Sequence, residues 1–221
     1  MEEGSPVSDD PAGRRDDNPY APPREALLAS PGVPPMPDWS PAQLWVLGWL
    51  ALAMVLGTLV IMLLSFGGFT RMRGVALYAN WLGLALVLLG NYLLLRLKGF
   101  VEARFAARGL GWPVWLCVVL GLLLEVVALR FEPGPLADWL AWLYAVALVG
   151  YGGLLVWLGA RLLGVPEAFR ALYGMGWLVI AGGLMLASLV LATQAALPLM
   201  GAYAVLARVF FRGAAELRGR A

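Results

Sequence analysis

Residues 44–66 read LWVLGWLALAMVLGTLVIMLLSF, an apolar stretch without a charged side chain. A helix of about 20 such residues crosses the ~30 Å hydrocarbon layer of a bilayer. Four similar stretches follow at about 75–95, 112–131, 138–160 and 170–191. The 221-residue chain is 61% hydrophobic and 14% charged, whereas soluble proteins are about 45–50% apolar with glycine included and about 25% charged. We therefore predict an all-α integral membrane protein.

The last apolar stretch, residues 195–211, decides how many times the chain crosses the membrane. It contains one charge, Arg208, and is either a short sixth span or an interfacial helix after five spans. Basic residues beside membrane spans favour the cytoplasmic side. Six spans place 13 basic residues inside and three outside, whereas five spans give nine and seven. We predict a bundle of six transmembrane helices with both termini in the cytoplasm, five spans being the alternative.

The N-terminal part of the chain has a different composition. Residues 1–38 hold eight acidic and three basic residues, a net charge of −5, and nine of the 15 prolines, whereas the remainder carries +7. Such a segment buries too little apolar surface to offset its loss of conformational entropy on folding. We predict a disordered acidic, proline-rich tail over 1–39, a membrane domain over 40–213 and a short basic C-terminus over 214–221. Ser40 and Gln43 match a helix capping box at the start of the first span.

Few polar side chains lie inside the predicted spans. Glu125 is the most unusual, because a charge at the bilayer centre costs about 2.5–3.5 kcal/mol on insertion scales. Arg71, Arg73 and Asn80 lie at similar depth and are candidate partners. Asn80 and Asn91 are about three helical turns apart and fall on one stripe, predicted to face protein. Glu125 is either a carboxylate that handles a proton or a cation or, as we favour from sequence, a protonated or paired acid that locks the bundle. The two asparagines either line a polar path with Glu125 or, as we favour, join helices.

Residues 96–111 form a basic amphipathic connection. Its candidate contacts with lipid headgroups are Lys98, Arg104 and Arg108, each gaining about 1 kcal/mol near an anionic leaflet. An ordinary cytoplasmic loop with the same charges is equally compatible with the sequence.

Glycines suggest where two helices approach closely. Gly150, Gly152 and Gly153 cluster in the fourth span, and Gly183 with Ala187 forms a small-xxx-small pair in the fifth. Such residues let helix backbones come near one another. We predict a close helix crossing at the glycine cluster rather than a hinge.

Composition and motifs exclude most catalytic chemistry. The chain has no histidine and one cysteine, Cys117, predicted to be a buried, inert thiol. It has no metalloprotease, nucleotide-binding or serine-hydrolase motif. We expect no catalytic residue, no cofactor, no metal and no nucleic-acid partner, and therefore not an enzyme.

Two functional classes remain. The sequence favours an interaction or scaffold protein, or an accessory subunit of a membrane complex, with the lipid bilayer, another membrane protein or a second copy as partner. The alternative is a small-solute transporter, or the substrate-binding membrane part of one, that uses Glu125 and the Asn80/Asn91 stripe. Fifteen arginines against one lysine and only two isoleucines suggest a bacterial gene of high GC content. The predicted location is the bacterial cytoplasmic (inner) membrane.

Overall fold

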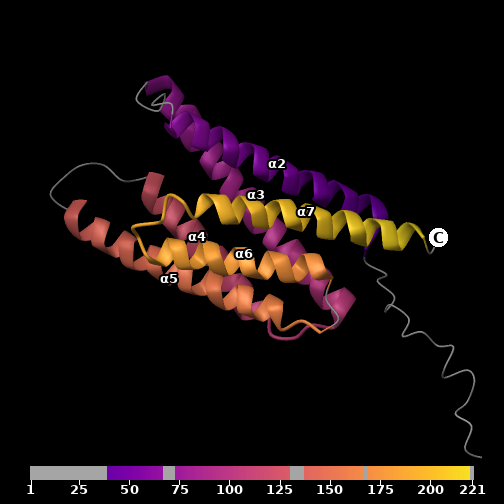
Figure 1. The fold of residues 1–221 in the computed structure, drawn as a ribbon. Helices are drawn as coiled ribbons and strands as arrows, with labels where there is room; N and C mark the ends of the chain where they lie inside the picture. Colours follow the sequence, from indigo (N-terminus) through magenta and orange to yellow (C-terminus); the bar gives the residue numbers. More distant parts are fainter. Residues whose placement is uncertain (1–38, 67–72, 130–136, 167–168, 220–221) are drawn as a thin grey trace, which may run out of the picture. The chain divides into compact units, whose positions relative to one another are not determined.

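The computed structural model describes residues 39–66, 73–129, 137–166 and 169–219 (Figure 1). The predicted disordered tail up to residue 38, Arg71 and Arg130 lie outside these residues, and so does the side chain of Arg73.

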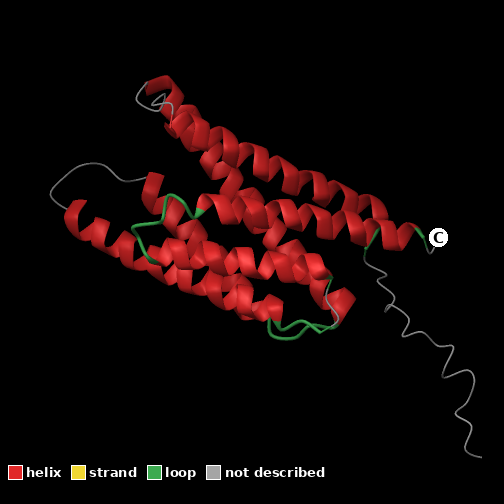
Figure 2. Cartoon of the chain, viewed as in Figure 1, coloured by secondary structure: helices red, strands yellow, loops and turns green. Residues whose placement is uncertain are grey.

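The described residues form six α-helices and contain no strand (Figure 2). In chain order these are α2 (Pro41–Phe66), α3 (Arg73–Phe105), α4 (Gly111–Leu129), α5 (Ala137–Leu163), α6 (Arg170–Ala187) and α7 (Ala196–Arg218). Each is long and apolar enough to cross a membrane. The prediction of an all-α chain with six helices of membrane-spanning length and hydropathy is confirmed for the described residues. The segment predicted at 195–211 belongs to one of them, α7.

Side-chain hydrogen bonds mark two helix ends. The backbone N–H of Gln43 donates to Ser40 Oγ over 3.1 Å, as expected for a serine that caps the start of α2. Helix α6 ends at Ala187, before the predicted end at 191. The Ser188 hydroxyl accepts a hydrogen bond from the backbone N–H of Leu191 over 3.2 Å, so it supports a turn in place of further helix.

Helix α3 continues into the connection predicted at 96–111 and ends at Phe105. Phe100 and Val101 are fully buried inside the protein, although the sequence predicts an interfacial segment here. The ring of Phe100 packs edge-to-face on Phe210 of α7, with 6.0 Å between the ring centroids. This contact with a helix distant in sequence extends α3 beyond its predicted span.

Helices α5 and α6 cross closely at glycines. A Cβ atom built on Gly152 would lie 2.5 Å from the carbonyl oxygen of Gly183, and one on Gly183 would lie 2.6 Å from that of Gly152. Two turns along α5, a Cβ on Gly159 would lie 2.7 Å from the Gly176 carbonyl oxygen. The predicted close crossing is present, and Gly152 makes it.

Helix α7 packs against both α2 and α6. Its buried residues recur every three or four positions, which is the spacing of one helix face; they include Ala202, Leu206, Val209, Phe210 and Gly213. The same helix therefore contributes to the core along most of its length.

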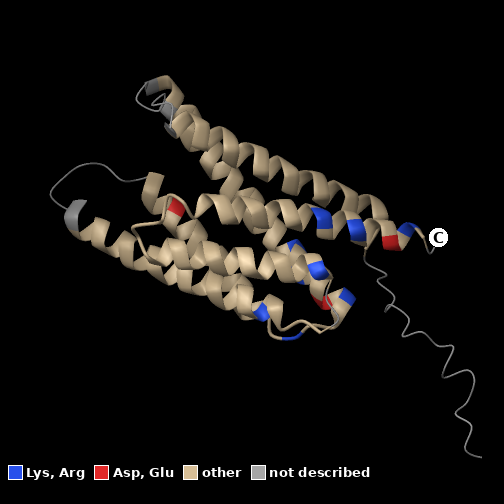
Figure 3. Cartoon of the chain, in the orientation of Figure 1, with Lys and Arg blue, Asp and Glu red and all other residues tan. Residues whose placement is uncertain are grey.

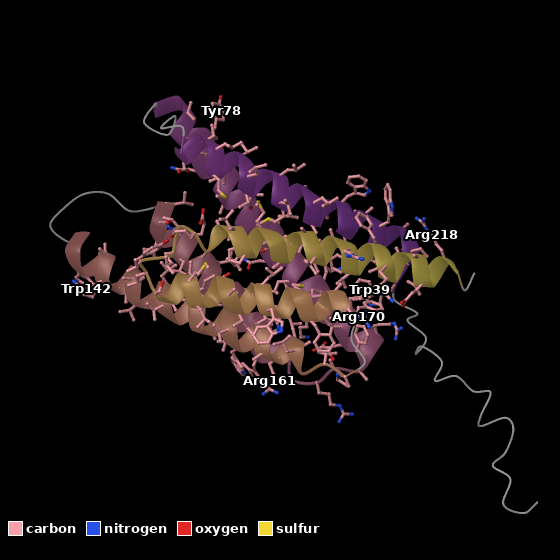
Figure 4. The ribbon with its side chains drawn as sticks, in the orientation of Figure 1. Trp39, Tyr78, Trp142, Arg161, Arg170 and Arg218 are labelled. Carbon is pink, nitrogen blue, oxygen red and sulfur yellow. The ribbon has the colours of Figure 1, made fainter. Side chains whose placement is uncertain are left out.

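Consecutive helices run in alternating directions, so the basic residues at the ends of different helices lie at the same end of the bundle. The starts of α2, α4 and α6 and the ends of α3, α5 and α7 form what we call the basic end. Every lysine and arginine side chain that the structure places lies toward it (Figure 3). Arg161, Arg170 and Arg218 lie toward it and Tyr78 and Trp142 toward the opposite end, here called the far end (Figure 4).

Candidate functional site

A partly open cavity of about 370 Å³ lies between the helices, and each of the six contributes residues to its wall. Small-molecule sites in proteins are clefts of about 300–1,000 Å³ with mostly apolar walls and a few polar groups. The polar residues in this wall are Thr58, Asn91, Glu125, Tyr144, Tyr151 and Tyr203. The other described lining residues are leucine, valine, methionine, alanine and glycine. The volume and the mostly apolar lining fall within the range of known small-molecule sites.

Glu125 is the one charged side chain among the described residues of the cavity wall. It is half-buried in the last turns of α4, toward the far end. A Cβ atom built on Gly83 of α3 would lie 3.6 Å from Glu125 Oε1, so a glycine of the neighbouring helix faces the carboxylate. The ion pairs recorded between described residues all involve Glu102 or Glu216, at the basic end.

The candidate partners of Glu125 fall into two groups. Arg71 and the side chain of Arg73 lie outside the described residues. Asn80 is exposed and is not part of the cavity wall. The structure therefore brings Asn91, but not Asn80, into the same cavity as Glu125.

Asn91 presents an unused hydrogen-bond donor. Its side-chain nitrogen Nδ2 is buried and has no hydrogen-bond partner among the described residues. A buried donor without a partner costs about 1–3 kcal/mol. Buried amide donors without a protein partner are uncommon in folded proteins, where ordered water or a ligand often accepts the hydrogen bond.

Three tyrosines complete the polar part of the wall. Tyr144 and Tyr151 are seven residues apart on α5 and therefore share a helix face. The Tyr151 ring lies against Gly121 of α4, where a Cβ would be 3.5 Å from its hydroxyl oxygen. The Tyr203 hydroxyl of α7 lies against Gly90 of α3, where a Cβ would be only 2.7 Å away. Glycines on the facing helices thus make room for the tyrosine side chains.

The tyrosines did not follow from the sequence reasoning. Their one signal is the seven-residue spacing of Tyr144 and Tyr151, which places both on one face of the fourth predicted span. The sequence does not distinguish these tyrosines from Tyr78 of α3, whose side chain is 77% exposed.

The three residues predicted to contact lipid headgroups lie at the basic end. Lys98 pairs with Glu102 over 3.0 Å, one turn further along α3. Arg104 pairs with Glu216 of α7 over 3.3 Å, and its guanidinium lies 5.7 Å from the ring centroid of Phe169. Arg108 is exposed. Contacts within the chain therefore occupy two of these three cations.

The described residues contain no cluster of metal-ligating side chains. Within residues 39–66, 73–129, 137–166 and 169–219, no three His, Cys, Asp or Glu side chains lie close enough to hold a metal ion. Cys117 is fully buried in α4 and does not line the cavity.

Comparison of the chain with protein-family models, with curated proteins and with solved structures found no match.

Proposed function

We propose that this protein binds a small amphipathic solute in the cavity between its six helices and carries it across the membrane. The observation behind the proposal is the combination of an apolar cavity of about 370 Å³ with Glu125, Asn91 and three tyrosines in its wall. A carboxyl group and an unpartnered amide are costly inside a membrane, and ionisable residues kept there usually serve a ligand or ion pathway.

The position of the cavity supports transport rather than permanent storage. All six helices line it, so a shift of some helices against the others changes which side of the membrane has access. Membrane carriers commonly hold their substrate between helices near the middle of the bilayer and open to each side in turn.

An interaction or scaffold role, which the sequence favoured, makes no use of the polar cavity. A scaffold gains nothing from a buried amide donor that has no partner among the described residues, whereas a solute-binding protein does. We therefore place transport first and keep partner binding as an outcome of the experiment.

We further propose that the basic end faces the cytoplasm of a bacterium, with the cavity in the cytoplasmic membrane. This orientation follows the bias of arginine and lysine toward the cytoplasmic side of membrane spans. It also puts the start of α2 and the end of α7 in the cytoplasm.

Uptake into proteoliposomes tests the proposal. The purified protein is reconstituted and assayed with a panel of labelled small amphipathic solutes. Ala202 lines the cavity and is buried, so Ala202→Phe fills the space and should abolish uptake. Ala204, two residues further along α7, is exposed and outside the cavity wall, so Ala204→Phe is the matched control and should transport normally.

Two results would overturn the transport proposal. One is the absence of protein-dependent uptake across the panel. The other is equal uptake by Ala202→Phe and the wild type. A stoichiometric membrane partner recovered in mild detergent, together with either result, would support the scaffold role.

A further inference from the structure

We infer that the solute is a small organic cation with an apolar body, held by the Glu125 carboxylate and the tyrosine rings of the cavity. This inference rests on the proposed solute-binding function and names the class of ligand that the site would select.

The charge of the cavity wall favours a cation. Glu125 contributes the one charge among its described lining residues, and no described lysine or arginine lines the cavity. In a site surrounded by hydrocarbon, charges interact much more strongly than in water. A cationic solute would compensate the carboxylate, a neutral one would leave it without an ionic partner among the described residues, and an anionic one would be repelled.

The aromatic residues add a second preference for a cation. Tyr144, Tyr151 and Tyr203 all line the cavity. A cation over an aromatic face is attracted by the ring quadrupole, most strongly when both are desolvated, and aromatic cages recognise quaternary ammonium groups in this way. The tyrosines come from α5 and α7 and Glu125 from α4, so the wall offers rings and a carboxylate from three different helices.

The rest of the wall suits an apolar ligand body. Met54, Met175 and Met200 line the cavity among leucines and valines. Methionine side chains adapt to irregular shapes, which suits cations of differing outline. Asn91 Nδ2, which lacks a partner among the described residues, could donate to an oxygen atom of a ligand that carries one.

The experiment compares three small aromatic ligands that differ in charge, two of which have the same shape. Phenyltrimethylammonium is a cation, tert-butylbenzene is its neutral isostere, and benzenesulfonate is a small aromatic anion. Equilibrium binding of each is measured on the full chain in lipid nanodiscs, with the cavity-filled Ala202→Phe variant as background. We expect the cation to bind at least about tenfold more tightly than the isostere, and the anion not to bind.

Variants assign the preference to named groups. Glu125→Gln should remove most of the advantage of the cation over the isostere and leave the smaller part due to the tyrosine rings, and Glu125→Asp should retain most of it. Tyr144→Leu should weaken cation binding several-fold, whereas Tyr144→Phe, which keeps the ring, should not. The matched controls are Glu102→Gln and Tyr78→Leu, both outside the cavity wall, and neither should change binding.

The outcomes separate this inference from the proposed function. Equal or tighter binding of tert-butylbenzene or benzenesulfonate, blocked by Ala202→Phe, would overturn the cation inference and leave the solute site in place. Such indifference to ligand charge is also the result expected if Arg71 or Arg73 neutralises Glu125. Loss of both binding and uptake for all solutes would instead overturn the proposed function.

Discussion

At the scale of single residues, Gly90 of α3 leaves no room for a side chain beside the Tyr203 hydroxyl in the cavity wall. A side chain as small as a methyl group would lie 2.7 Å from the Tyr203 hydroxyl and 3.3 Å from Met54 Cε. Both distances are shorter than an ordinary van der Waals contact between a carbon atom and another non-bonded heavy atom. The absence of a side chain at Gly90 therefore sets where the tyrosine hydroxyl lies.

We expect Gly90→Ala to displace the Tyr203 hydroxyl and weaken solute binding several-fold. The overpacking should also lower the free energy of unfolding by about 1–3 kcal/mol. The double variant with Tyr203→Phe lacks the hydroxyl and should regain most of the solute affinity and most of the free energy of unfolding. The measurements are ligand affinity and thermal unfolding in detergent.

The control for this prediction is Gly153→Ala on α5, where the added methyl meets no atom within 4 Å. It should leave both measurements unchanged. If Gly90→Ala behaves like this control, the Tyr203 hydroxyl does not depend on Gly90.

Sequence reasoning could identify some residues of the candidate site and not others. Glu125 was identifiable because a charge inside an apolar span is unusual in any fold. The tyrosines were not, because tyrosine is common both in cores and at membrane interfaces, and only the neighbouring helices decide which ones face the cavity. For the same reason, helical spacing could place Asn80 and Asn91 on one stripe of the helix. It could not show that Asn91 lines the cavity and Asn80 does not.

At the scale of helices, the contact between α5 and α6 depends on glycine. Atoms near a Cβ on Gly183 would include the Gly152 carbonyl oxygen at 2.6 Å and the Val156 nitrogen at 2.9 Å. These are backbone atoms, so they cannot rotate away as a side chain would. A larger residue must separate the helices.

We expect Gly183→Val to destabilise the protein by about 1–3 kcal/mol or more, because the overpacked backbones must move apart. Gly174→Val is the matched control on the same helix, since a Cβ there meets nothing within 4 Å. Thermal unfolding of both variants in one detergent measures the difference. Similar unfolding temperatures would show that the two helices are not held at the distance described.

Hydropathy and the distribution of arginines were sufficient to predict six membrane-length helices. They could not predict the length of α3. Arg96 and Lys98 resemble the end of a span in sequence, yet the helix continues, with Lys98 paired to Glu102 and Phe100 buried against Phe210. Contacts with α7, which lies far along the chain, favour the helix at a point where the local sequence predicts that it ends.

At the scale of the whole molecule, the distribution of charge implies an orientation in the membrane. The described lysine and arginine side chains lie toward the basic end (Figure 3). The turn between α6 and α7, which includes the exposed Ser188, lies at the far end. These two surfaces should be accessible from opposite sides.

We expect an impermeant thiol reagent applied to intact cells to label Ser188→Cys and to leave Arg218→Cys unlabelled. Both variants are made in a Cys117→Ala chain, and the wild type is a control because its single cysteine is fully buried. A periplasm-sensitive reporter fused after Ala221 should be silent. The reverse labelling pattern, or an active reporter, would contradict a cytoplasmic basic end.

The length of α3 has a mechanical consequence. Its 33 residues span about 50 Å, more than the ~30 Å of hydrocarbon that a membrane helix must cross. One continuous rod thus carries Asn91 in the cavity wall and, about 20 Å further along, Arg104 beside Glu216. A tilt of α3 about the cavity would therefore also displace Arg104 relative to Glu216, because both ends belong to one continuous helix.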